Sequence, residues 1–131
     1  MIKIFSKFKI IFYFINFFLI FLYIYPGSLI GLVIYGDKKI QPQITPDFIV
    51  SSNHFYVFIV ISIIGFLSFT TPKQINYLTI YLIIISILLE LSHLIIPART
   101  FQWSDLFGNF LGVIIAILIK QFINKYVSFD K

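Results

Sequence analysis

Long apolar runs alternate with short polar segments along the chain, and this pattern predicts four membrane-crossing helices. Four stretches contain no Asp, Glu, Lys or Arg, and they lie between Lys9 and Asp37, Asp47 and Lys73, Lys73 and Glu90, and Asp105 and Lys120. A helix needs about 20 mostly apolar residues to span a bilayer. Helix-breaking residues place the predicted helices at about 9–25, 53–71, 76–96 and 104–124. We therefore expect an all-α, polytopic integral membrane protein with a single domain over 1–131.

The longest segment without a predicted spanning helix is 26–52. Pro26 and Gly27 break the first helix. The apolar piece 28–35 that follows is too short to span a bilayer. It either lies at the membrane interface, which we favour, or prolongs the first helix past a kink at Pro26. The lysines before the first helix also suit a signal peptide, but no A-x-A-like cleavage site follows, so an uncleaved helix is expected.

Composition supports a membrane protein and narrows its chemistry. The chain is 60% hydrophobic and 11% charged, with a mean hydropathy of +0.99, whereas a soluble domain carries about 25% charged residues. The absence of cysteine excludes disulfides, thiolate catalysis and Cys-based zinc sites. The net charge of +5 comes from lysines beside apolar segments. Membrane orientation explains them better than nucleic-acid binding, because no basic and aromatic face accompanies them.

The distribution of basic residues predicts the orientation of the chain. Four crossings put both termini and the middle loop on one side of the membrane. Seven basic residues lie on that side, namely Lys3, Lys7, Lys9, Lys73, Lys120, Lys125 and Lys131. Three lie on the opposite side, namely Lys38, Lys39 and Arg99. Because cytoplasmic loops carry an excess of Lys and Arg, both termini are predicted to be cytoplasmic in a plasma membrane.

Polar residues gather at one end of the expected bundle. In the predicted topology the starts of the second and fourth helices and the end of the third lie at the outer end. Ionisable groups at membrane depth are costly and usually face the protein interior or a water-filled cavity. The inner half of the helices has no matching set. The candidate polar site therefore consists of His54, Glu90, His93, Arg99, Asp105 and Asn109.

Residue spacing places several of these side chains on shared helix faces. Ser86, Glu90 and His93 are four and three residues apart, so they lie on one face of the third helix. Asp105 and Asn109 are four residues apart and share a face of the fourth helix. The polar faces of these two helices can therefore meet.

Each residue also has a simpler interpretation. Gly108 and Gly112 form a small-xxx-small pair that predicts close helix packing. Glu90 at a helix end can simply reach headgroup water. Asp105 at a helix start can simply interact favourably with the helix dipole, with no further role. Interfacial or interhelical hydrogen bonding is the alternative for His54, His93 and Asn109. The joint location of the set, rather than any single residue, favours a functional interpretation.

The same residues resemble a family signature. The segment from Glu90 to Gly112 reads E-L-S-H-L-I-I-P-A-R-T-F-Q-W-S-D-L-F-G-N-F-L-G. It resembles the hallmark of VanZ-like membrane proteins, roughly E-x-x-Q-x-x-x-P-x-R-x-x-x-x-x-D-x-x-x-N-x-x-G. Six positions agree in type and spacing, namely Glu90, Pro97, Arg99, Asp105, Asn109 and Gly112. His93 stands where the family commonly has Gln.

The resemblance covers the second to fourth predicted helices, and the first only by its hydrophobicity. The family tends to place D-K-x-x-H before its second helix; His54 fits, whereas Val50 and Ser51 replace the Asp and Lys. The resemblance implies one VanZ-like transmembrane domain, in a bacterial inner-membrane protein concerned with the cell envelope. It supplies no reaction and names no catalytic residue.

Three functions compete. The favoured one is a binding or accessory protein in which Arg99 binds phosphate or carboxylate, while His54, Glu90 and His93 orient it or contact a polar headgroup. The alternative is a membrane-embedded enzyme acting on a lipid-linked or anionic envelope substrate, with the same acid and imidazoles as general acid-base groups or metal ligands. The third is a structural protein whose polar residues set helix register. A transporter is disfavoured because the polar set does not continue to the inner side.

The partners and cofactors follow from these hypotheses. We expect membrane lipids as partners, together with a lipid-linked or anionic envelope ligand. We expect no nucleic acid, no metal and no cofactor. The oligomeric state is left open.

Overall fold

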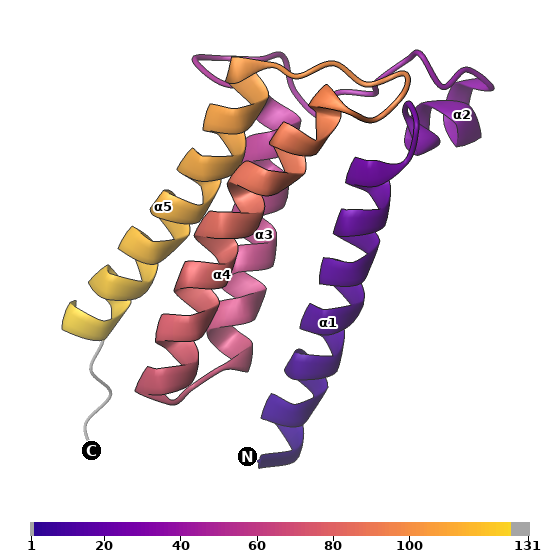
Figure 1. Ribbon diagram of the computed structural model, residues 1–131. Coiled ribbons are helices and arrows are strands. Elements are labelled where there is room, and N and C mark those ends of the chain that lie inside the picture. The colour runs from indigo at the N-terminus through magenta and orange to yellow at the C-terminus, as the bar shows by residue number, and fades with distance from the viewer. Residues whose placement is uncertain (1, 127–131) are drawn as a thin grey trace.

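Four long helices lie side by side in the described part of this protein (Figure 1). The computed structural model describes residues 2–126, with side chains over 8–126. Within that part of the chain every regular element is a helix, which confirms the all-α prediction. In order they are α1 (Ile2–Ile24), α2 (Leu29–Tyr35), α3 (Ser52–Ser68), α4 (Pro72–Leu91), the 3₁₀ helix η1 (Ser92–Leu94) and α5 (Trp103–Tyr126).

Two of these helical segments, Pro72–Leu94 and Trp103–Tyr126, are long and apolar enough to cross a membrane. Phe8–Ile24 and Leu29–Tyr35 meet the same requirement only as a pair, and the pair is bent by 84°. The apolar helix α3 has 17 residues and falls short of the requirement. These apolar helices indicate a membrane protein with two or three candidate spans, and the fourth crossing stays a prediction.

The turn between α3 and α4 lies earlier than the sequence suggests. The predicted end of the second helix at Thr71 is wrong, because α3 ends at Ser68 and Phe69 is extended. The predicted start of the third helix at residue 76 is also late, because α4 begins at Pro72. Proline suits the first turn of a helix, and the Thr71 hydroxyl accepts the Gln74 amide there. The residues that seemed to close one helix therefore open the next.

Segment 26–52 forms a short helix followed by a loop that hydrogen bonds attach to α3. Gly27 has a φ of 94°, and α2 is turned away from α1 by 84°. A Cβ at Gly31 would lie 1.8 Å from the Ile40 carbonyl oxygen, so only glycine allows the loop to cross α2 there. The side chain of Asn53 in α3 then holds the loop, because it accepts from the Ile44 amide (2.9 Å) and donates to the Pro42 carbonyl (2.6 Å). The interfacial position of α2 stays a prediction.

The most extensive helix contact joins α3 and α5. Gly108 and Gly112 lie on this contact. A Cβ at Gly108 would lie 2.9 Å from the Ser51 carbonyl oxygen, and one at Gly112 would lie 2.6 Å from that of Phe55. The two glycines thus let the backbones of α3 and α5 approach more closely than side chains would allow.

The helices bury apolar side chains inward and also expose them outward. Phe58 and Leu82 are completely buried in the core. In contrast, Phe14 and Phe17 of α1 are 71% and 70% exposed. An apolar outer surface on this scale suits a lipid environment rather than water. We call the end of the bundle that lies opposite the α3–α4 turn the polar end. It contains the end of α1, the starts of α3 and α5, and the α4–α5 connection (Figure 1).

Candidate functional site

All six candidate site residues belong to the polar end. His54 is in the first turn of α3, Glu90 is near the end of α4, and His93 is in η1. Arg99 lies in the connection to α5, whose first turns carry the other two residues, Asp105 and Asn109. Five of the six contact one another, and Arg99 lies apart from them.

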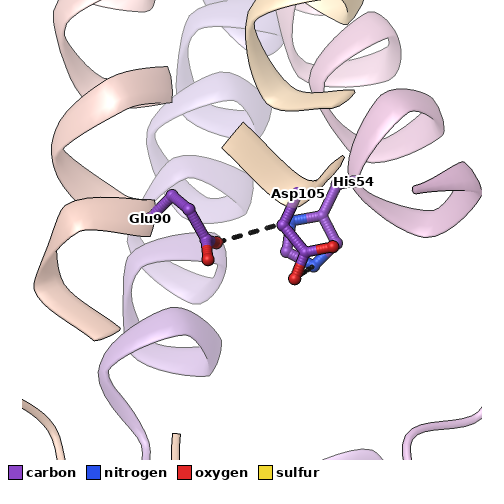
Figure 2. A group of neighbouring side chains, drawn as sticks. All are labelled: His54, Glu90 and Asp105. Carbon is purple, nitrogen blue, oxygen red and sulfur yellow. Dashed lines mark ion pairs between the residues drawn. The ribbon is translucent and has the colours of Figure 1, made fainter. Parts of the chain in front are cut away.

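His54 lies between two carboxylates from different helices (Figure 2). Its Nε2 is 3.4 Å from Asp105 Oδ2, and its Nδ1 is 3.9 Å from Glu90 Oε2. The side chains of His54 and Asp105 are 15% and 16% exposed, whereas that of Glu90 is completely buried. The exposure of these side chains therefore decreases from Asp105 and His54, which are partly exposed, to Glu90, which is completely buried.

Glu90 also joins α4 to the connection that follows it. Its Oε1 accepts a hydrogen bond from the Gln102 amide at 3.0 Å. Its Oε2 lies 3.2 Å from His93 Nδ1, one helical turn along the chain. That approach does not have hydrogen-bond geometry, so Glu90 Oε2 is a buried oxygen without a hydrogen-bond partner in the described part of the chain.

Tyr23 of α1 contacts three of the candidate residues, although it is not among those predicted from the sequence. We call Tyr23 and the five candidate residues that contact one another the cluster. Its hydroxyl donates to Asn109 Oδ1 at 2.6 Å and lies 2.7 Å from His54 Nδ1. Its ring stacks on His93 with centroids 5.6 Å apart. The chain has eight tyrosines, and those near helix ends suit interfacial anchoring. No spacing signal distinguishes Tyr23, because its partners lie 31 and 86 residues away.

Asn109 joins the remaining helices. Its Oδ1 accepts from Tyr23 and lies 3.0 Å from His54 Nδ1, while its Nδ2 donates to the Ser86 carbonyl at 3.1 Å. A single completely buried amide thus connects α1, α3, α4 and α5. The Ser86 contribution comes from its backbone, since the Ser86 hydroxyl donates to the Ile83 carbonyl.

Donor and acceptor chemistry fixes one nitrogen of each histidine. The Tyr23 carbonyl can only accept, so His93 Nε2 donates to it at 3.1 Å. The Tyr23 hydroxyl donates its only proton to Asn109 Oδ1. It can therefore only accept from His54, so His54 Nδ1 carries a proton and donates to that hydroxyl. The other nitrogen of each ring faces a carboxylate oxygen. Two lone pairs repel at such distances, so each of these two contacts requires a proton or a cation.

Arg99 binds main-chain carbonyls rather than a carboxylate. Its Nε donates to the Tyr25 carbonyl at 3.1 Å and its Nη2 to that of Leu22 at 2.6 Å. These oxygens lie at the C-terminal end of α1, where carbonyls lack helical partners and a cation is favoured. Burial lowers the pKa of the Arg99 guanidinium, while Glu90 and Asp105 act in the opposite direction. The group stays charged at neutral pH.

A backbone turn presents Arg99 to α1. Ala98, immediately before it, has a φ of 59°, which is the left-handed region that residues other than glycine rarely adopt. Such a conformation persists where surrounding contacts hold it. The next residue, Arg99, makes the two hydrogen bonds to the Tyr25 and Leu22 carbonyls.

A cavity of about 470 Å³ lies beside the cluster, between α1, α2 and α3. Its wall is mostly apolar, with Phe18 and Leu22 on α1 and Val57 on α3. Its polar groups include three of the candidate site residues, namely His54, His93 and Arg99. Small-molecule sites typically combine such an apolar wall with a few polar groups in this size range.

Comparison with protein-family models, with curated proteins and with solved structures finds no match to this chain. The VanZ-like resemblance therefore stays a prediction.

Proposed function

We propose that this chain is a VanZ-like accessory protein of the bacterial inner membrane that binds an anionic, lipid-linked ligand of the cell envelope. The apolar chain of the ligand occupies the cavity between α1 and α3, and its anionic headgroup binds at Arg99. The observation that carries the proposal is the cavity itself, because apolar side chains line it while Arg99, His54 and His93 contribute its polar groups. An amphiphilic ligand is divided in the same way, into an apolar chain and a polar headgroup.

The chemistry of Arg99 supports an anionic headgroup. Its Nε and Nη2 are held by backbone carbonyls, and it forms no ion pair with a carboxylate among residues 8–126. Its charge is therefore not neutralised by a protein acid in direct contact. A planar guanidinium binds phosphate or carboxylate through paired hydrogen bonds, and a half-buried one does so more strongly than one in water.

The topology proposed with this function has four crossings, with both termini cytoplasmic and the polar end outside. Lys73 at the start of α4 and Lys120 and Lys125 in α5 support it, because they lie away from the polar end (Figure 1). Lys131 lies outside the described residues, and the side chains of Lys3 and Lys7 are likewise not described.

Cysteine labelling tests this topology directly, because the natural chain contains no cysteine. Ile49→Cys marks the polar end, where Ile49 is 95% exposed, and Lys73→Cys marks the other end. In intact spheroplasts a membrane-impermeant maleimide is expected to label Ile49→Cys alone, and both after lysis. Labelling of Lys73→Cys in intact spheroplasts would refute the orientation.

Ligand binding is tested with a matched pair of probes, farnesyl phosphate and farnesol, added to the purified protein in detergent. Farnesyl phosphate is expected to bind at least about tenfold more tightly, since a hydrogen bond to a charged group contributes about 1.5–3 kcal/mol. Arg99→Gln is expected to abolish that preference, whereas Lys39→Gln, which removes another cation near the polar end, is expected to keep it. Equal affinity for the two probes in the natural protein would contradict the proposal.

The cavity has its own test. Val57→Trp places a large side chain into the lining of the cavity. It is expected to weaken both probes together, because it takes the space of their common chain. Leu118→Trp is a matched control on the exposed surface of α5, where Leu118 is 53% exposed. Unchanged binding in Val57→Trp would place the ligand elsewhere.

A membrane-embedded enzyme acting on such a ligand is the second candidate. The position of His54 between Asp105 and Glu90 favours it, since an imidazole held by carboxylates is suited to general acid-base catalysis. Release of inorganic phosphate from farnesyl phosphate by the natural protein, but not by His54→Gln, would favour the enzyme. A purely structural role predicts instead that neither probe binds and that cluster variants lose folded yield only.

A further inference from the structure

The carboxylate of Glu90 lacks a fixed counter-charge although it is completely buried. Its Oε1 receives one amide hydrogen bond, and its Oε2 receives none. Burial of a carboxylate is costly unless the charge is paired. The guanidinium of Arg99 donates to the Leu22 and Tyr25 carbonyls rather than to Glu90. The nearest ionisable neighbour of Glu90 Oε2 is His93 Nδ1 at 3.2 Å, so this contact is open to a proton on that ring or to a metal cation.

Other ligand atoms converge on the same point. One donor atom from each of His54, Glu90 and Asp105 lies within 4.8 Å of the other two. The Glu90 carboxylate points toward the His54 ring, and Asp105 lies beside that ring (Figure 2). These three residues come from α3, α4 and α5, so packing of the whole bundle sets their separation.

We propose that His54, Glu90 and Asp105 together bind a divalent transition-metal ion of the Zn²⁺ class. Two carboxylates and one dication sum to zero charge, which removes the cost of the buried acid. Imidazole as a ligand favours zinc and similar metals over Mg²⁺ or Ca²⁺, which prefer oxygen ligands alone. The lone-pair contact between His54 Nε2 and Asp105 Oδ2 is relieved when both atoms face a cation.

Three protein ligands leave a zinc ion one open position, as in sites where the metal contacts water or a substrate. His54 also lines the cavity, so an exogenous anion can reach the metal from that side. Metal binding does not depend on the lipid proposal, because it is measured on the protein without added lipid. Either proposal can fail while the other stands.

The test uses the full-length protein, purified in detergent without a polyhistidine tag and dialysed against micromolar Zn²⁺. The natural protein is expected to retain one zinc per chain by mass spectrometry of the metal content. Glu90→Gln keeps an acceptor for the Gln102 amide but removes the charge, and it is expected to weaken zinc binding at least about tenfold in a competition titration. Asp47→Asn, the same change at an acid outside the cluster, is expected to bind like the natural protein.

X-ray absorption at the zinc edge provides a second readout that needs no variant. The zinc-loaded natural protein is expected to show an N/O first shell near 2.0–2.1 Å with imidazole scattering. No retained zinc, an all-oxygen shell without imidazole, or equal loss of affinity in Asp47→Asn would each overturn the proposal. Glu90→Gln that folds and binds zinc with unchanged affinity would also overturn it.

Discussion

Alanine at Gly112 is expected to separate α3 from α5. The added Cβ would lie 2.6 Å from the Phe55 carbonyl oxygen and 2.9 Å from Phe58 Cβ. Ordinary van der Waals contact begins at 3.4 Å, so the nearest atoms must move apart by about 0.8 Å, the difference between 3.4 and 2.6 Å. The backbone oxygen cannot rotate away, and overpacking of this kind costs about 1–3 kcal/mol.

Gly65 of α3 provides the matched control. A Cβ there would also be crowded, at 3.0 Å, but by the ends of the Leu78 and Phe12 side chains, which can move. Both substitutions gain the same helix propensity of about 1 kcal/mol. The propensity term therefore cancels in the comparison, and Gly112→Ala is expected to be less stable than Gly65→Ala by about 1–3 kcal/mol.

Tryptophan fluorescence measures this difference. The chain has one tryptophan, Trp103, at the start of α5, the helix that carries Gly112. Unfolding in mixed micelles by increasing SDS is followed by its emission, and the two variants are compared at equal lipid and detergent content. If Gly112→Ala proves as stable as Gly65→Ala, the α3–α5 backbones are not held in close contact and the reasoning fails.

Three further variants test two polar contacts and one backbone conformation with the same unfolding assay. Tyr23→Phe is expected to cost about 1 kcal/mol, because the His54–Asn109 contact at 3.0 Å survives; a loss above about 3 kcal/mol would show that the hydroxyl holds the whole network. Asn16→Leu removes the acceptor of the 2.6 Å bond from Tyr81 and is expected to cost about 0.6 kcal/mol, an ordinary interhelical hydrogen bond in a membrane. Ala98→Gly is expected to be neutral or stabilising by up to about 1 kcal/mol, since left-handed backbone strains alanine but not glycine; clear destabilisation would contradict that account.

Apolar run length was enough to predict the helices, but not where each begins. The runs that predict helices near 9–25, 53–71, 76–96 and 104–124 correspond to α1, α3, α4 with η1, and α5. The boundary at Thr71–Pro72 was misplaced, because the same two residues can end a helix or cap the next one. The sequence alone cannot decide between these two roles, because only the folded backbone shows that α3 ends at Ser68.

The location of the candidate residues at one end of the helices was predictable, but the contacts that they make were not. The four predicted crossings would place the starts of the second and fourth helices and the end of the third at one end of the bundle, and this prediction grouped Glu90 with His54 and Asp105 without any contact information. Two contributions have no sequence pattern: the phenol of Tyr23, which resembles any interfacial tyrosine, and the carbonyls of α1 that bind Arg99. Main-chain acceptors are present at every residue, so only the folded geometry identifies which ones are used.

The cluster at the polar end has a consequence for the order in which the protein is assembled. Its members come from four helices that emerge at different times, and Asp105 and Asn109 belong to the last of them. Before α5 is in place, Tyr23 lacks its amide acceptor and His54 lacks one carboxylate. Tyr23 and His54 thus obtain these partners only when the final helix arrives, which makes the placement of α5 the step that completes the cluster.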